Sequence, residues 1–225
     1  MAKPIPLTTV LRELSKLYDP PKTFLHFRTP FDLLIVTLLS AQCTDKRVNE
    51  VSKALFQKYR KPEEYVRVSR AELERDIHSC GTYRNKARFV QELSHILLEK
   101  HGGKVPETME ELTALPGVGR KTASIILSVA FGKNESIAVD THVLRVARRL
   151  GLTKQKNPDN VSDDLMKESP RKEWGRVTTL LISHGRAVCT ARKRQCSICV
   201  FQRECPSSLT KKRPDLAKDQ ASIGS

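Results

Sequence analysis

Four cysteines near the end of the chain restrict the possible folds more than any other feature. They are Cys189, Cys196, Cys199 and Cys205, spaced C-x6-C-x2-C-x5-C. Thiolates this close in sequence can surround one metal centre, either a tetrahedral zinc ion or an iron–sulfur cluster. A zinc ribbon usually has two C-x2-C pairs with a long gap between them, whereas this chain has one close pair flanked by longer loops. The spacing therefore favours a 4Fe-4S cluster inside one folded loop, with zinc as the alternative.

The charge balance suggests the kind of partner. The 225 residues include 40 Lys and Arg against 25 Asp and Glu, a formal net charge of +15. Such an excess favours a polyanionic partner, with nucleic acid first and an anionic membrane surface second. A basic protein of thermophilic or ribosomal type is the alternative.

The sequence lacks an apolar run of 18 residues, and its first residues lack a signal-peptide pattern. We therefore expect neither a membrane span nor export, and predict a cytoplasmic protein. Thiols stay reduced in the cytoplasm, so clustered cysteines there indicate metal ligands rather than disulfides.

Apolar residues recur at helical spacing along most of the chain, which predicts an all-α fold. Two segments, Phe31–Ala41 and Thr122–Phe131, are apolar all round, as is typical of buried helices. The other expected helices lie within 1–22 and 108–116 and at Arg47–Tyr59, Ala71–Ser79, Arg84–His101, Val139–Leu150, Asn160–Glu168 and Pro170–Val188. Residues 207–225 are polar and basic, which indicates a disordered tail.

The segment Leu115-Pro-Gly-Val-Gly-Arg-Lys-Thr122 joins two of these helices. Gly117 and Gly119 allow a tight turn with positive φ and let backbone N–H groups approach a ligand with no side chain in the way. The next helix begins here, so its positive end points to the same place. Such a hairpin can hold DNA phosphates without reading bases. A plain turn between helices is the alternative.

Lys121 lies in the first turn of the helix that follows. Beside a helix N-terminus and partly desolvated, its amine is more easily deprotonated and can attack a sugar C1′ to form a Schiff base. A lysine that only contacts phosphate is the alternative.

Asp140 stands in Ile137-Ala-Val-Asp-Thr-His142, directly before a predicted helix. Its position alone favours an N-cap over a catalytic carboxylate. The two roles can coexist, because a capping carboxylate can still face a cleft.

Several motifs together resemble one family. They are the hairpin LPGVGRKTA, the VDTH sequence, the cysteine loop, Leu39-Ser-Ala-Gln-Cys-Thr-Asp45, the segment Gly81–Ala87 and His184-Gly-Arg186. From about Leu7 to Cys205 the sequence resembles the endonuclease III family. Its members are bifunctional pyrimidine-lesion DNA glycosylases of the helix-hairpin-helix superfamily with a C-terminal 4Fe-4S cluster.

The resemblance implies base excision repair of duplex DNA that contains oxidised pyrimidines or abasic sites. Lys121 would displace the damaged base and form an imine, and β-elimination would then cut the strand on the 3′ side. Asp140 would assist Lys121 and stabilise positive charge on the sugar. The resemblance also implies a monomer at the nucleoid with no membrane partner.

It implies DNA contacts as well. Gln42 would fill the gap left by the flipped nucleotide. Thr82 stands where the family usually has an apolar wedge such as Leu, so its shorter polar side chain should stack less well on the orphan base. The hairpin contacts would come from Gly117, Val118, Gly119 and Arg120. Asp45 and His142 would be supporting residues near the site.

The cysteine loop carries Arg192, Lys193 and Arg194 between its first two cysteines. Three cations on a loop whose two ends are held by cysteine ligands could bind DNA phosphates. The alternative is that these charges are simply solvated. Cys43 and Cys80 match no ligand position, and we interpret them as small packing residues.

The resemblance implies two helical domains with DNA in the cleft between them. Residues 23–134 would form a six-helix domain with the hairpin. Residues 1–22 would join 135–206 in the cluster domain, and 207–225 would be the tail.

Three other functions are alternatives to a bifunctional pyrimidine-lesion glycosylase. An adenine-mismatch glycosylase lacks the lysine, carries a catalytic Glu in its early buried helix and adds a C-terminal domain. Here Lys121 is present, Leu33–Thr44 has no carboxylate, and the sequence ends about 20 residues after the cysteines. A monofunctional mismatch glycosylase should also lack the lysine. The presence of both Lys121 and Asp140 argues against a non-catalytic DNA-binding iron–sulfur protein.

Overall fold

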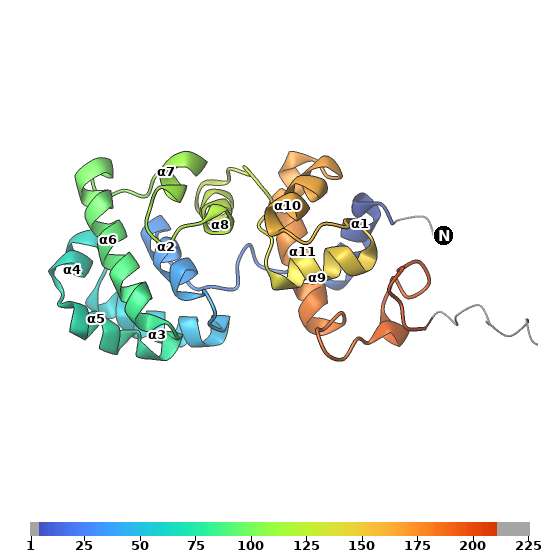
Figure 1. Ribbon diagram of the computed structural model, residues 1–225, viewed down its shortest axis with the longest axis horizontal. Helices are drawn as coiled ribbons and strands as arrows, with labels where there is room; N and C mark the ends of the chain where they lie inside the picture. Colours follow the sequence, from blue (N-terminus) through green and yellow to red (C-terminus); the bar gives the residue numbers. More distant parts are fainter. Residues whose placement is uncertain (1–4, 211–225) are drawn as a thin grey trace, which may run out of the picture. The chain divides into compact units, whose positions relative to one another are not determined.

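The computed structural model describes residues 5–210, and helices dominate them (Figure 1). These residues contain no strand, only an isolated antiparallel bridge between Cys189 and Arg194. The α-helices are α1 Leu7–Leu17, α2 Pro30–Leu39, α3 Asp45–Lys58, α4 Pro62–Arg67, α5 Arg70–Asp76, α6 Tyr83–His101, α7 Met109–Thr113, α8 Arg120–Phe131, α9 Thr141–Leu150, α10 Pro158–Lys167 and α11 Trp174–Ala187. Three short 3-10 helices are η1 His78–Cys80, η2 Arg171–Glu173 and η3 Cys196–Ile198. The all-α prediction is confirmed; the predicted tail from residue 211 onward lies outside the described residues.

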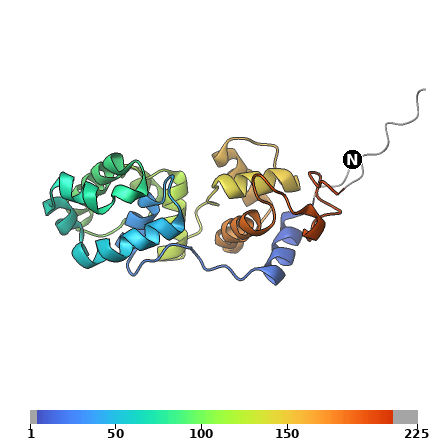
Figure 2. The same ribbon diagram turned by 90° about the horizontal axis from the view of Figure 1, so that it is seen from below.

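The chain divides into two compact units. One comprises Pro20–Ala138 and Pro170–Thr179, and so contains α2 to α8. The other comprises the described residues up to Asp19, Val139–Ser169 and the described residues from Leu180 onward. In Figure 2 the blue α1 accordingly lies with the yellow-to-red segments. The boundaries predicted from the resemblance, after residues 22 and 134, stay a prediction.

Helix α2 forms the centre of the first unit. Thr29 caps it by accepting a hydrogen bond from Asp32 N at 3.1 Å, and Pro30 occupies its first turn, where a missing N–H costs nothing. All residues of Phe31–Leu39 are buried, and the helix packs against α3, α6 and α8. Full burial of one aliphatic side chain contributes about 1.5–3 kcal/mol, so this helix supplies a large share of the unit's stability.

One helix of this unit was absent from the sequence prediction. Pro62–Arg67 forms α4, which makes seven α-helices rather than six between residues 23 and 134. The segment is too short to display an apolar period. Pro62 starts the helix, and the Glu64 carboxylate accepts a hydrogen bond from Lys61 N at 3.0 Å. Side-chain contacts to backbone groups therefore define where this helix begins, while Pro62 and Tyr65 are buried and the helix packs against α6.

None of the helices in the described part of the chain is long and apolar enough to cross a membrane.

Candidate functional site

The hairpin between α7 and α8 is held by two buried side chains. Leu115 is 3 % exposed, Val118 is 5 % exposed, and Val118 N donates to Leu115 O at 3.1 Å. Gly117 has φ +76°, as expected. Gly119 does not use the positive φ that glycine allows: it is the extended N-cap of α8, with φ −94°. One positive-φ residue suffices to reverse the chain, so the second glycine leaves its backbone uncovered instead of completing the turn.

The two hairpin glycines should respond differently to substitution. A Cβ at Gly117 would lie 2.8 Å from Cδ2 of Phe89, and its φ disfavours every L-residue. We expect Gly117→Ala to lower the free energy of unfolding by about 1–3 kcal/mol. A Cβ at Gly119 would meet nothing within 4 Å, so Gly119→Ala should change stability by less than about 0.5 kcal/mol. Urea denaturation measures both; equal losses would contradict the assigned turn geometry.

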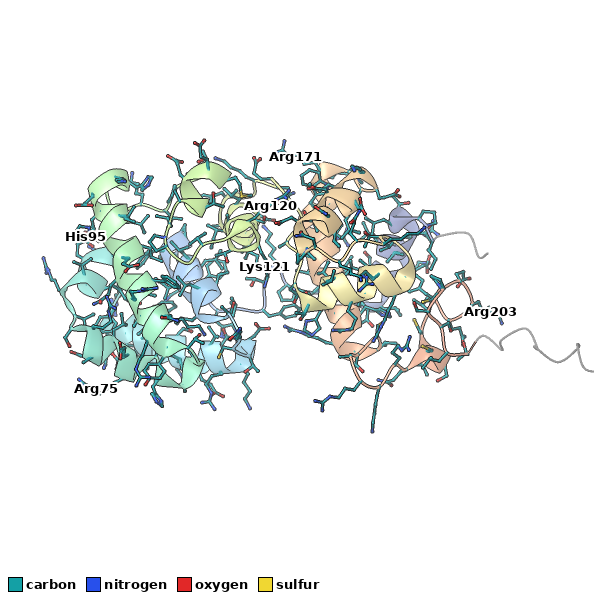
Figure 3. All side chains as sticks on the ribbon, viewed as in Figure 1. Arg75, His95, Arg120, Lys121, Arg171 and Arg203 are labelled. Atoms are coloured by element: carbon teal, nitrogen blue, oxygen red, sulfur yellow. The ribbon has the colours of Figure 1, made fainter. Side chains whose placement is uncertain are left out.

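Lys121, labelled in Figure 3, is the second residue of α8. Its side chain is exposed. The partial desolvation expected from the sequence is thus not provided by the protein itself. Arg120 and Lys121 occupy the first turn, which contains no acidic residue. Cations at this end of a helix oppose its dipole by about 0.3–1 kcal/mol each. Two cations beside exposed N–H groups make the start of α8 strongly attractive to an anion.

Asp140 is the N-cap of α9. Its Oδ1 accepts hydrogen bonds from the backbone N–H groups of His142 and Val143, both at 2.8 Å. Its Oδ2 lies 3.1 Å from Nδ1 of His142. The cap predicted from position is therefore present. The side chain is 18 % exposed, so the carboxylate is oriented by these partners and still open to solvent.

Lys121 belongs to the α2–α8 unit and Asp140 to the other. Each residue therefore has its own local setting, an exposed amine at a helix start and an oriented carboxylate at a helix cap.

Gln42 and Thr82 occupy two loops that touch. A Cβ at Gly81 would lie 3.8 Å from the backbone oxygen of Gln42. Among the described residues only Gln42, at φ 53°, and Thr82, at φ 42°, are non-glycine residues with positive φ. Each such conformation costs on the order of 1–3 kcal/mol, and both side chains are exposed. Asp45 lies close in sequence, as the first residue of α3.

The sequence reasoning missed Lys86, which lies beneath these loops. It is 3 % exposed, and its ammonium donates to the carbonyls of Leu39, at 2.8 Å, and Cys80. Lys86 shares the buried face of α6 with Val90, Leu93 and Leu97. A lysine in register with that apolar stripe was the available signal.

The four predicted ligand cysteines line one small cavity of about 20 Å³, together with Arg149, His184 and Arg194. Two arginines of α9 hold the loop around it. Arg145 Nε donates to Cys189 O at 3.1 Å, and Arg149 Nη1 donates to Thr190 O at 2.7 Å. No three His, Cys, Asp or Glu side chains in residues 5–210 are arranged to hold a single metal ion.

The three cations of the cysteine loop differ in how exposed they are to solvent. Arg192 and Lys193 are exposed. Arg194 is half-buried, and its Nη1 donates to Ser207 O at 2.9 Å. Arg194 therefore stabilises the loop, while the other two point to solvent.

His184 is a buried neighbour of the cysteines that the sequence did not single out as a site residue. It is 1 % exposed, with Nε2 3.6 Å from Cys199 Sγ and Nδ1 3.3 Å from Tyr18 Oη. Burial lowers the pKa of His184 to about 4, so the imidazole stays neutral at pH 7. Burial also raises the pKa of the Cys199 thiol.

The class of the protein follows from the hairpin fold and from sequence. Residues 35–171 match a family described as HhH-GPD superfamily base excision DNA repair protein. Endonuclease III from Synechocystis sp. is 47 % identical over 201 residues, covering 89 % of this chain and 92 % of the relative. Endonuclease III from Bacillus subtilis is 43 % identical over 209 residues, covering 92 % and 95 %.

A solved structure agrees with these relatives. It is a trapped covalent intermediate between endonuclease III and DNA, in an estranged-adenine complex. It is 46 % identical, with a TM-score of 0.86, and the match covers 89 % of this chain and 94 % of that chain. The chain belongs to the endonuclease III family, within the helix-hairpin-helix superfamily of base excision repair DNA glycosylases. The family resemblance and the enzyme class predicted from the sequence are confirmed.

Proposed function

We propose that this enzyme is a bifunctional glycosylase and abasic-site lyase that removes oxidised pyrimidines from duplex DNA. The observation that carries the proposal is the exposed Lys121 amine in the first turn of α8, directly after the hairpin. The relative trapped as a covalent intermediate with DNA supports a covalent mechanism. The enzyme acts as a monomer at the nucleoid, where its substrate lies.

The Lys121 amine attacks C1′ of the damaged nucleotide. A C1′–N bond forms as the bond to the base breaks, and the departing base takes up a proton. The nitrogen, having lost a proton, then expels O4′ from C1′, so the sugar ring opens, O4′ becomes a hydroxyl and a protonated imine remains at C1′. Loss of a C2′ proton then expels the 3′ phosphate by cleaving the C3′–O bond. The strand is thus cut on the 3′ side of the abasic site.

Asp140 stabilises the positive charge that develops on the sugar. Its carboxylate is held by three hydrogen-bonding partners, so it needs little reorganisation when the charge appears. His142 supplies one backbone and one ring contact, and so acts as a supporting residue.

The other predicted residues bind and open the duplex. Gly117, Gly119 and Arg120 contact phosphate, while the buried Val118 shapes the hairpin. Gln42 fills the gap left by the flipped nucleotide, and Thr82 faces the orphan base. Asp45 supports the Gln42 loop from the start of α3.

The four cysteines hold a 4Fe-4S cluster. Their thiols line one cavity, and Arg145 and Arg149 hold the surrounding loop by hydrogen bonds to its backbone. Four thiolates in one cavity are the ligand set of such a cluster. A cluster filled by four thiolates supplies no open position for substrate, so it acts as a structural centre. Arg192 and Lys193 then contact the DNA backbone from a fixed loop, while Arg194 holds that loop.

Loss of one ligand should remove the cluster. We expect Cys199→Ser to lower bound iron from about four ions per chain to about one or fewer, and to bleach the visible absorption. Cys43→Ser is the matched control, because Cys43 lies outside the cavity, and it should keep its iron. The measurement is the iron and zinc content of the purified proteins. Stoichiometric zinc in place of iron in the unchanged protein would contradict the assignment of a 4Fe-4S cluster.

The function is tested on a duplex with one oxidised pyrimidine and on the undamaged duplex of the same sequence. We expect base release, strand cutting without alkali and a borohydride-trapped adduct on the damaged duplex alone. Base release with no adduct would identify a monofunctional glycosylase. Binding with neither reaction would identify a non-catalytic DNA-binding protein.

A further inference from the structure

Lys86 is a buried cation that the reaction described above does not use. It stands in the first turns of α6 with 3 % of its surface exposed, next to the fully buried Ala87. Burial lowers its pKa, because an ammonium loses its hydration inside the protein. Lysine is rarely so buried unless its charge has fixed partners.

Its partners are the ends of two other helices. The ammonium donates to the carbonyl of Leu39, the last residue of α2, at 2.8 Å, and to that of Cys80, the last residue of η1. Carbonyls in the last turn of a helix have no partner within it and lie at the negative end of the helix dipole. Lys86 therefore joins the ends of α2 and η1 through one charged group.

Each of these helix ends leads directly into one of the two loops. Gln42 lies three residues beyond Leu39, and Thr82 lies two beyond Cys80. Both have positive φ, and conformations of this kind persist only where the surroundings impose them. Lys86 N also donates to Thr82 O at 3.2 Å, so Lys86 restrains the Thr82 loop through its backbone and its side chain.

We propose that Lys86 is a positioning residue that holds Gln42 and Thr82 in the conformations needed to occupy an opened base pair. The inference rests on the proposed function, in which these two side chains enter the duplex. The single Lys86 ammonium restrains both loops. Gln42, which fills the gap, and Thr82, which faces the orphan base, therefore keep a fixed distance from each other. Lys86 itself does not contact DNA.

The central test is Lys86→Met, which keeps the apolar stem and removes the charge and its donors. Base release from the duplex lesion in single turnover should fall by about 10- to 100-fold, as expected when contact groups shift by about 1 Å. Borohydride trapping on a single-stranded abasic oligonucleotide needs no base-pair opening and should change less than about twofold by the same reasoning. A proportional loss in both assays would show a merely structural role and overturn the proposal.

A second readout follows the loops without chemistry. With 2-aminopurine opposite the lesion, its fluorescence should rise less on binding to Lys86→Met than on binding to the unchanged enzyme. Lys100→Met is the matched control, because it replaces an exposed lysine on the same helix, and it should match the unchanged enzyme in every assay. An unchanged fluorescence response in Lys86→Met would overturn the proposal even if the proposed chemistry proved wrong.

A mutant cycle separates positioning from independent effects. If Lys86 acts through the loops, adding Lys86→Met to the Gln42→Ala, Thr82→Ala double variant should cost less than about twofold in base release. Independent effects would multiply, and that result would overturn the proposal. If Lys86→Met does not fold, Lys86→Gln removes the charge but keeps an amide N–H₂ group as donor, and it takes the place of Lys86→Met in the same cycle. Absence of any adduct in the unchanged enzyme would instead refute the proposed function alone.

Discussion

Replacing Lys121 with alanine should abolish the borohydride-trapped adduct and lower strand cutting by about a thousandfold or more, as expected for loss of a nucleophile. The side chain is exposed at the start of α8, so thermal stability should hardly change. The measurement is single-turnover cutting of a duplex with one oxidised pyrimidine, together with the yield of trapped adduct on a denaturing gel.

Lys121→Arg separates attack on the sugar from contact with phosphate. Arginine keeps the positive charge but stays protonated, so it can hold a phosphate and cannot form the imine. We expect Lys121→Arg to bind DNA as tightly as the unchanged enzyme, with a similar salt dependence, and to give no adduct. If Lys121→Arg retained strand cutting, Lys121 would be a phosphate contact, and the nucleophile would have to be another residue.

Asp140→Asn should lower base release by about 100- to 1,000-fold while leaving the fold nearly intact. Asparagine keeps the Oδ1 acceptor for the backbone N–H groups of His142 and Val143, and it caps helices as well as aspartate does. The charge beside the α9 N-terminus is lost, which should cost less than about 1 kcal/mol. The amide N–H₂ then faces Nδ1 of His142 in place of Oδ2, where the ring nitrogen can accept a hydrogen bond from it. The measurements are single-turnover base release and thermal unfolding of the same preparations.

A second substitution distinguishes the capping role of Asp140 from its catalytic role. Asp140→Ala should lose the activity and, in addition, about 1 kcal/mol of stability, because the cap itself is gone. Asn157 is the matched control: it caps α10 in the same unit, accepting from Asp159 N at 2.8 Å. Asn157→Ala should lose similar stability and keep full activity. If Asp140→Asn released base at the normal rate, Asp140 would be a cap and nothing more.

The loop of cysteines shows where local sequence information stops. Spacing alone predicted that four thiols would gather, and they do line one cavity. It could not predict Arg145 and Arg149, which reach the loop across 44 and 41 residues of sequence. Nor could it predict His184, which lies against Cys199 because α11 brings the two together.

The hairpin, too, was predictable from the sequence only in part. Its place between two helices followed from the Pro-Gly sequence and the apolar runs on either side. The roles of its two glycines did not, because φ depends on how the chain packs. Gly117 packs against Phe89 of α6, whereas Gly119 starts α8 in open space.

The sequence by itself determined the all-α class, the buried helix α2, the existence of α8, the capped start of α9 and the family; the burial predicted for α8 holds only for Ala123, Ser124, Ile126 and Leu127. These depend on helical periodicity, caps and short motifs, which are interactions within a few residues. Only the tertiary structure decided that Lys86 joins the ends of α2 and η1 beneath the loops of Gln42 and Thr82. The reason is physical: a buried charge is stabilised by carbonyls that packing supplies, and its Leu39 partner lies 47 residues away in the chain.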